Sequence, residues 1–259
     1  MRYTFGDNDD AARRLEVLAE VFEPSTRALL SYADRLSPKL ALDLGCGPGY
    51  STRLLAECVE CDRLVGLDNS EEFVRIAGDS APANASFLIH DVTKTPFPTG
   101  PADLIFCRLL LTHLDRPLET VHAWGTQLRT CGLLLVEEVE RIRTRKPLFG
   151  EYLAIVEAML ANQGSELYVG PMVDRLEDSG RLRRRAGGVH RLRVSNRDAS
   201  RMFLLNLRSW QDRSFTRSNY SPRIIANMEA ELSALAESPS TESDIEWGMR
   251  HLCLERVAG

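Results

Sequence analysis

A glycine-rich run near the start of the chain is the part of the sequence best suited to hold a ligand. Residues Asp43–Gly49 have the sequence Asp-Leu-Gly-Cys-Gly-Pro-Gly; they follow an apolar stretch typical of a buried strand, and a helical pattern begins at Tyr50. Alternate glycines let the backbone turn tightly and let a ligand approach without meeting Cβ atoms. A strand, a glycine loop and a helix in this order indicate a loop that binds a nucleotide or nucleoside.

The spacing of the glycines helps to define the ligand. A dinucleotide loop has the pattern G-x-G-x-x-G/A, but here the third glycine, Gly49, comes one residue early, and Tyr50 stands where a small residue should pack. Asp43 precedes the first glycine by two residues, and a carboxylate there is unexpected beside a pyrophosphate. A carboxylate at this position instead suits a ligand with a positively charged end. The pattern therefore favours a cationic nucleoside over NAD.

Two more carboxylates close predicted strands. Asp68 ends the run Leu64–Asp68, and Asp91 ends the run Phe87–Asp91. The carboxyl ends of strands form the edge where open α/β sheets bind ligands, so Asp68 could accept both hydroxyls of a ribose and Asp91 the amino group of an adenine. Aspartate commonly ends strands, so one such residue alone would mean little. Three of them at successive strand ends beside a glycine loop form a specific set.

The elements that must position these residues begin at Leu40, where short apolar runs alternate with helical stretches. The strand candidates are Leu40–Leu44, Arg63–Asp68, Ser86–His90, Ala102–Cys107 and Gly132–Val139. The helices expected between them are Tyr50–Cys58, Ser70–Gly78 and Arg116–Arg129. Buried parallel strands are typically continuous apolar runs, and their alternation with helices indicates a doubly wound α/β fold.

Further elements are expected on both sides of this core. A helical pattern runs from Asn8 to about Leu36 and is interrupted at Pro24. The helices expected after the fifth strand are Phe149–Gln163, Pro171–Asp178, Asn196–Trp210 and Ser221–Glu237, and the last strand candidates are Arg184–Val194 and Ile245–Val257. We therefore predict a mostly parallel seven-stranded sheet in three segments: an N-terminal helical lid (residues 1–36), a Rossmann-like cofactor-binding core (37–140), and cap helices with the C-terminal strands (141–259).

Composition excludes several classes of protein. The formal net charge of −5 does not favour a polyanion as the main partner, and no apolar stretch reaches the eighteen or more residues of a membrane helix. The N-terminus lacks the apolar core of a signal peptide. Cys58 and Cys61 are the only close pair among six cysteines, and no second pair completes a zinc set. These features predict a cytoplasmic protein with free thiols and without a metal site.

Residues 40–140 resemble the class I S-adenosylmethionine-dependent methyltransferases. The matching motifs are Asp43–Gly49, Asp68–Ser70, Asp91–Val92, and Leu104–Arg108 with His113–Pro117. The rest of the chain resembles small-molecule methyltransferases of actinobacterial type, in which an N-terminal segment, here Tyr3–Asp7 and Ala11–Leu15, forms a lid. The resemblance is specific for the cofactor core and says little about the substrate.

The resemblance implies S-adenosylmethionine as the cofactor and S-adenosylhomocysteine as its product. The implied cofactor-binding residues are Tyr3, Arg14, Asp43, Gly45, Cys46, Gly47, Asp68, Asn69, Asp91, Val92, Cys107 and Arg108. The glycine loop and Asp43 would hold the methionine end, Asp68 and Asn69 the ribose, and Asp91 and Val92 the adenine. Backbone groups of Cys107 or Arg108 would hold the amino acid tail. Tyr3 and Arg14 would close over the cofactor; the alternative for Arg14 is a solvated helix charge.

A general base could assist methyl transfer to oxygen or nitrogen. His113 is the first candidate, because it follows the fourth strand at the ligand edge; the alternative is that it only packs near the cofactor. Glu137 and Glu138 end the fifth strand and point to opposite faces, so at most one enters the pocket. We take Glu138 as the candidate and expect the other glutamate to be solvated or paired with Arg141 or Arg143.

The sequence thus predicts methylation of a small organic acceptor at O, N or C, such as a natural-product or aromatic scaffold of secondary metabolism. The aromatic residues expected in the cap are Tyr168, Trp210, Phe215 and Tyr220, which would either wall a planar substrate or form the cap core. The basic runs Arg181–Arg185 and Arg191–Arg193 raise RNA methylation as an alternative, but aromatic residues are not interleaved there, and a charged strand edge or a subunit contact also explains them. Protein methylation and a non-catalytic cofactor-binding subunit stay open, and a homodimer is a default expectation.

Overall fold

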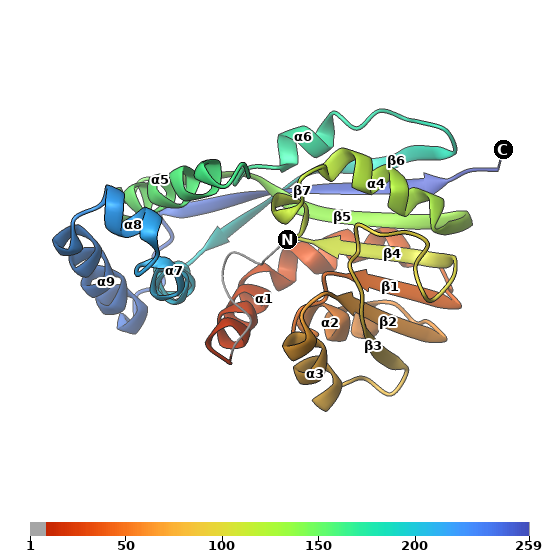
Figure 1. The fold of residues 1–259 in the computed structure, drawn as a ribbon, viewed down its shortest axis with the longest axis horizontal. Coiled ribbons are helices and arrows are strands. Elements are labelled where there is room, and N and C mark those ends of the chain that lie inside the picture. The colour runs from red at the N-terminus through yellow and green to blue at the C-terminus, as the bar shows by residue number, and fades with distance from the viewer. Residues whose placement is uncertain (1–8, 259) are drawn as a thin grey trace.

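The computed structural model describes residues 9–258, which form one seven-stranded sheet flanked by helices (Figure 1). The strands are β1 (Leu40–Leu44), β2 (Arg63–Asp68), β3 (Ala85–Ile89), β4 (Ala102–Arg108), β5 (Leu128–Thr144), β6 (Leu182–Val194) and β7 (Ile245–Arg256). Their order is β3-β2-β1-β4-β5-β7-β6. Strands β1 to β5 pair in parallel, and β7 runs antiparallel to both of its neighbours. The predicted doubly wound, mostly parallel sheet is confirmed.

Helices cover both faces of this sheet. They are α1 (Asp9–Leu30), η1 (Ser31–Ala33), α2 (Tyr50–Cys58), α3 (Glu71–Asp79), η2 (Leu111–His113), α4 (Pro117–Thr126), α5 (Pro147–Asn162), α6 (Gly170–Asp174), α7 (Asn196–Trp210), α8 (Ser214–Asn219) and α9 (Pro222–Glu237). Side chains of α1 and α2 share a core with one face of the central strands, and side chains of α4 and α6 share a core with the other face. Because both faces are covered, β1 is buried along its whole length.

The N-terminal helix differs from the sequence prediction, because α1 continues through Pro24 as a single helix. Proline removes one helical hydrogen bond and typically costs about 3 kcal/mol or more inside a helix. Burial offsets this cost, since Phe22 is 2% exposed and Leu29 is fully buried. Ser25 and Thr26, in the turn after the proline, donate hydrogen bonds to Glu137 of β5 at 2.6 Å each. The predicted break at Pro24 was therefore wrong, because these contacts with the sheet outweigh local propensity.

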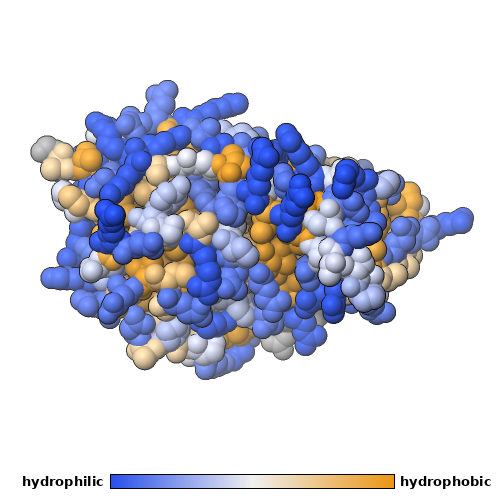
Figure 2. Space-filling view, turned by 180° about the vertical axis from the view of Figure 1, so that it is seen from behind, coloured by the Kyte–Doolittle hydropathy of each residue, from blue (hydrophilic) through white to orange (hydrophobic). Residues whose placement is uncertain are grey.

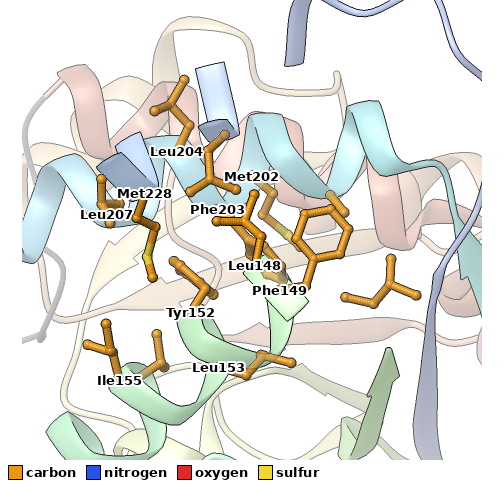
Figure 3. Packing of buried hydrophobic residues seen from close by; sticks show 14 of the residues in the cluster. Leu148, Phe149, Tyr152, Leu153, Ile155, Met202, Phe203, Leu204, Leu207 and Met228 are labelled. Carbon is orange, nitrogen blue, oxygen red and sulfur yellow. The ribbon is translucent and has the colours of Figure 1, made fainter. Parts of the chain in front are cut away.

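The helices after β5 form a cap with a core of its own. Phe149 and Tyr152 of α5 point toward α7, where both rings contact Phe203, at centroid distances of 5.5 and 4.1 Å (Figure 3). The same core includes Val17 of α1 and Trp247 of β7. Strand β5 runs without interruption across residue 140, so the cap is built onto an extension of the sheet.

Two details of the cap differ from the prediction. Helix α6 ends at Asp174 rather than at Asp178, because the Asp178 side chain accepts a hydrogen bond from the backbone N–H of Arg184 at 2.8 Å and thereby helps to start β6. The short helix α8, after Trp210, was not predicted. Its six residues are too few for a periodic apolar pattern to emerge.

The described surface carries polar groups over most of its area. The face opposite to that of Figure 1 is largely hydrophilic, with smaller apolar areas between long hydrophilic side chains (Figure 2). Between residues 9 and 258, no helix combines the length and the apolar content that crossing a membrane requires. All six cysteines are free.

Candidate cofactor and acceptor site

The glycine loop follows β1 and is fixed to the end of β2. The N–H groups of Gly45 and Cys46 both donate to the carbonyl of Leu67, at 2.8 and 3.2 Å. Gly49 has φ +83°, and a Cβ there would lie 3.0 Å from the Cβ of Ala77, so this position requires glycine. A Cβ at Gly47 would meet only Leu15 of α1, at an ordinary 3.6 Å. The loop is thus tight at its end, while Gly47 at its centre is buried but not overpacked.

Asp43, at the start of this loop, is hydrogen-bonded to the helix that follows the loop. Its side chain is 1% exposed and accepts hydrogen bonds from the hydroxyls of Ser51 and Thr52 at 2.7 and 2.6 Å. Burial raises the pKa of Asp43 to about 6, while the two hydroxyls oppose this shift. Both hydroxyls belong to the first turn of α2, where a negative charge also meets the positive end of the helix dipole. These bonds give Asp43 a role inside the protein; its predicted contact with a methionine end stays a prediction.

Asp68 lies at the carboxyl end of β2, directly beside the loop. One carboxylate oxygen accepts from the N–H of Gly47 at 2.8 Å, and the other accepts from the N–H of Ser70 at 2.9 Å. Ser70 in turn caps α3 by accepting from the N–H of Phe73 at 3.2 Å. The carboxylate is therefore held between the loop and the next helix. Asn69, between the two, is exposed.

Asp91 and Val92 follow β3 at the same edge of the sheet. Asp91 accepts from the backbone and hydroxyl of Thr93, and its pKa is lowered, chiefly by the hydroxyl. The side chain keeps 40% of its surface exposed, beside Lys94 at 3.4 Å. Val92 is buried, and its carbonyl accepts from the indole N–H of Trp124 at 2.8 Å. The structure thus brings the ends of β1, β2 and β3 together, as the sequence predicted.

The end of β4 directs its side chains away from this edge. Cys107 is fully buried between the strands and α4. The guanidinium of Arg108 donates to the hydroxyl of Thr26 at 3.2 Å, on the α1 face. Burial lowers the pKa of Arg108, whereas the nearby charges of Glu137 and Asp43 raise it. Because both side chains are engaged elsewhere, the backbone of this segment is what a ligand at the edge can reach.

Glu137 is fully buried beneath α1, which corrects one expectation. Besides Ser25 and Thr26, the Nε2 atom of His251 lies 3.1 Å from its carboxylate. It is therefore neither solvated nor paired with Arg141 or Arg143. The expectation was wrong because α1 covers this face of β5. The hydrogen bonds and the imidazole lower the pKa of Glu137 although burial alone would raise it.

Glu138 points to the opposite face and anchors the loop after β4. One oxygen of its carboxyl group accepts from the N–H groups of both Leu110 and Leu111, at 2.8 and 2.7 Å. This loop includes Leu109, whose φ of 52° is unusual for a residue with a side chain. Burial raises the pKa of Glu138 to about 8. Its contacts give it a positioning role, and its predicted catalytic role stays a prediction.

His113 ends η2 in the segment that Glu138 anchors, and Arg14 of α1 lies near it. Burial and the Arg14 cation lower the pKa of His113 to about 4, so the imidazole is neutral at physiological pH. Arg14 itself is only 2% exposed and donates to the side-chain oxygen of Asn206 in α7 at 3.1 Å. The alternative of a solvated helix charge was therefore wrong. Tyr3, also predicted to close over the cofactor, lies outside the described residues.

Sequence reasoning missed Asn206 and Tyr152, which the fold places beside Arg14. Burial raises the pKa of Tyr152, while Asn206 and Arg14 oppose the shift. Asn206 is one of several polar residues in an amphipathic helix, and Tyr152 belongs to a mostly apolar one; neither pattern signals a site. Only the packing of α5 and α7 against α1 brings them together.

The basic runs on β6 are partly neutralised. Arg184, Arg185 and Arg193 pair with carboxylates of Asp174, Glu255 and Glu246, at 3.0, 3.7 and 3.8 Å respectively. Charged residues on an exposed edge strand typically prevent that strand from pairing with another chain, and these arginines fit such a role.

The fold and the residues at the carboxyl edge of the sheet indicate a nucleoside-binding domain. Comparison with known proteins narrows the class of this domain. Residues 41–132 match the family model described as a methyltransferase domain. This segment is therefore similar to methyltransferase domains, and its fold is the Rossmann-like fold of methyltransferases.

Among characterised relatives, the chain is similar to trans-aconitate 2-methyltransferases. It is 33% identical to that of Rhizobium etli over 111 residues, which is 43% of each chain, and 33% identical to that of Yersinia pestis (strain Pestoides F) over 128 residues, which is 49% of this chain and 48% of the relative. The chain thus spans less than half the length of the relatives it matches.

Solved structures share the fold over most of the chain. A putative methyltransferase from Bacillus halodurans superposes with a TM-score of 0.57 at 14% identity, covering 91% of this chain and all of that one. Coclaurine N-methyltransferase bound to N-methylheliamine and S-adenosylhomocysteine gives 0.54 at 16% identity over 90% of this chain and 72% of that one. The [4+2]-cyclase SpnF gives 0.56 at 19% identity over 92% and 82%. These likenesses establish the fold alone, since one fold supports different chemistries.

Proposed function

We propose that this protein transfers a methyl group from S-adenosylmethionine to a small organic acceptor. The observation that carries the proposal is the position of Asp68, whose carboxylate is held at 2.8 Å from the N–H of Gly47 in a glycine loop of the methyltransferase type. A carboxylate in that place is suited to the two hydroxyls of a ribose. The relatives named above and the shared fold support the same activity.

The residues around the loop fit this cofactor. Asp43, Asp68 and Asp91 bring three carboxylates to successive strand ends, and a cationic nucleoside suits them better than a pyrophosphate does. When bound, S-adenosylmethionine supplies an electrophilic methyl group on its sulfonium.

Each predicted residue has a place in this proposal. Asp68 and Asn69 would hold the ribose, and Asp91 with Val92 the adenine. The remaining contacts, to the methionine end, would come from Asp43, Gly45, Cys46, Gly47, backbone groups of Cys107 and Arg108, and the lid residues Tyr3 and Arg14.

Alignment and exclusion of water are the main contributions we assign to the protein. His113 has a pKa of about 4 and is a weak base, while the raised pKa of Glu138, about 8, favours its protonated form at neutral pH. A strong general base therefore forms no part of the proposal. Holding two reactants in line can lower a barrier by roughly 7–11 kcal/mol in favourable models. The cap helices and η2 would hold the acceptor, and burial in the cap core would keep water out.

Calorimetric titration with S-adenosylmethionine, S-adenosylhomocysteine and NAD tests the proposal. We expect both sulfur compounds to bind and NAD to give no heat beyond dilution. Methyl transfer from labelled cofactor to candidate acceptors then tests the activity itself. Binding of NAD without the sulfur compounds would overturn the cofactor assignment.

A further inference from the structure

A cluster of polar side chains lies buried where the lid helix, η2 and the cap meet. We call Arg14, His113, Tyr152, Asn206 and Trp210 the buried polar cluster. They come from α1, η2, α5 and α7, four elements that are distant in sequence. Polar groups in such a core cost free energy unless they have hydrogen-bond partners. The hydrogen bonds within this cluster therefore indicate which kind of ligand it could bind.

Trp210 is the member whose main polar atom has no partner. Its side chain is fully buried, and the Nε1–H makes no hydrogen bond to any of the residues 9–258. Its ring lies 5.9 Å from that of Tyr152, tilted by 43°. The indole N–H is near enough to the Tyr152 hydroxyl to oppose the rise in the pKa of that hydroxyl, but the two groups do not meet hydrogen-bond geometry. Leaving such a donor unsatisfied costs about 1–3 kcal/mol. The comparable indole of Trp124, equally buried, donates to the carbonyl of Val92 at 2.8 Å.

The cluster is rich in donors. Arginine and tryptophan side chains can only donate hydrogen bonds. The side-chain oxygen of Asn206 accepts from Arg14 at 3.1 Å, and its amide NH₂ carries two N–H donors, one of which serves the Tyr152 hydroxyl while the other remains for a ligand. Burial raises the pKa of Tyr152, so its hydroxyl keeps a proton to donate. A ligand complementary to this set carries several acceptor oxygens and a negative charge.

The cluster also lies beside the cofactor loop. The side chain of Leu15, next to Arg14 in α1, lies 3.6 Å from where a Cβ of Gly47 would be, at the centre of the loop. Leu110, in the segment that leads to His113, lies within 2.8 Å of where a Cβ of Gly45 would be. The elements that carry Arg14 and His113 therefore adjoin the loop, near which an acceptor must lie to meet the methyl group.

We propose that the buried polar cluster binds a carboxylate of the methyl acceptor through the indole N–H of Trp210 and the amide N–H of Asn206, which Arg14 orients by donating to the side-chain oxygen of Asn206. The acceptor is then a small organic acid. This inference rests on the proposed function, because it places the acid in the acceptor position of a methyltransferase. It concerns cap residues that lie outside the matched domain, residues 41–132.

The indole N–H of Trp210 provides a direct readout of this site. In a ¹⁵N–¹H spectrum of the labelled protein, its resonance is assigned by its loss in Trp210→Phe. Acetate, the smallest carboxylate probe, is titrated with and without saturating S-adenosylhomocysteine, and acetamide serves as the uncharged control of the same shape. The resonance of Trp124, whose indole is already bonded to Val92, is the internal control.

We expect acetate to shift the Trp210 indole proton downfield with saturation, while Trp124 stays in place and acetamide has little effect. In Asn206→Leu, the same shift should need several-fold more acetate. The inference is overturned if Trp210 moves no more than Trp124, if acetamide acts as acetate does, or if Asn206→Leu leaves the affinity unchanged. Absence of S-adenosylhomocysteine binding would instead count against the proposed function, so the two failures are distinguishable.

Discussion

The carboxylate of Asp68 accepts a hydrogen bond from the backbone N–H of Gly47, 21 residues earlier, at 2.8 Å. This bond joins the end of β2 to the centre of the glycine loop. Because the other carboxylate oxygen is held by Ser70 at 2.9 Å, the side chain has a fixed orientation before any ligand arrives. Preorganisation of this kind lowers the entropic cost of binding.

Replacement of Asp68 by alanine should therefore weaken cofactor binding severely. The variant loses charge-assisted hydrogen bonds, each worth about 1.5–3 kcal/mol, so we expect a loss of affinity of at least about tenfold by calorimetry with S-adenosylhomocysteine. Asp79→Ala is the matched control, since Asp79 is an exposed acid in α3 with 70% of its side chain accessible. Equal affinities in the two variants would remove the ribose assignment.

Glu138 should prove to be a positioning residue in unfolding measurements. Glu138→Gln keeps a side-chain oxygen for the N–H groups of Leu110 and Leu111, whereas Glu138→Ala leaves two buried donors unpaired, at about 1–3 kcal/mol each. We expect denaturant titration to show a loss of about 2–5 kcal/mol for alanine and clearly less for glutamine. A stability of the alanine variant close to that of the wild type would contradict this role.

The pH dependence of Glu138 has a defined sign. Its pKa is raised from 4.5 to about 8 in the folded protein, so the folded state binds the proton more tightly than the unfolded chain. Its contribution to stability is full below pH 4.5 and is lost as the pH rises toward about 8. Relative to the wild type, Glu138→Gln should lack this decline between the two values. Parallel stability curves would show that Glu138 is ionised throughout.

The glycine loop and the carboxylates at successive strand ends could be predicted because their types and spacing are local. The parallel sheet topology brings the ends of neighbouring strands to one edge, so Asp43, Asp68 and Asp91 come together once the strands are known. Strands β1 to β5 could likewise be placed from their apolar runs.

The interior partners could not be predicted, because they depend on long-range packing. Ser25 and Thr26 meet Glu137 only because α1 crosses β5, and the same contacts explain why Pro24 does not break the helix. Asn206 reaches Arg14 across 192 residues of sequence. No spacing within one element signals such pairs.

A methyl group added at the end of the glycine loop should be costly. Gly49 has φ +83°, and its new Cβ would lie 3.0 Å from that of Ala77 and 3.2 Å from the ring of Phe87. We expect Gly49→Ala to lower the free energy of unfolding by about 1–3 kcal/mol, as strain and overpacking typically do. Gly78→Ala is the control, since a Cβ there has nothing within 4 Å and lies in α3. Equal thermal midpoints for both variants would contradict the tight packing of this loop.

His113 should remain neutral across the physiological range. Burial and the cation of Arg14 hold its pKa at about 4, below the ordinary 6.5, so its ring resonances should not titrate between pH 8 and about 5 in NMR spectra. Arg14→Met should raise the pKa of His113 only in part, because burial is the larger cause. An inflection of His113 near pH 6.5 in the wild type would show that the imidazole is solvated, and would restore it as a candidate general base.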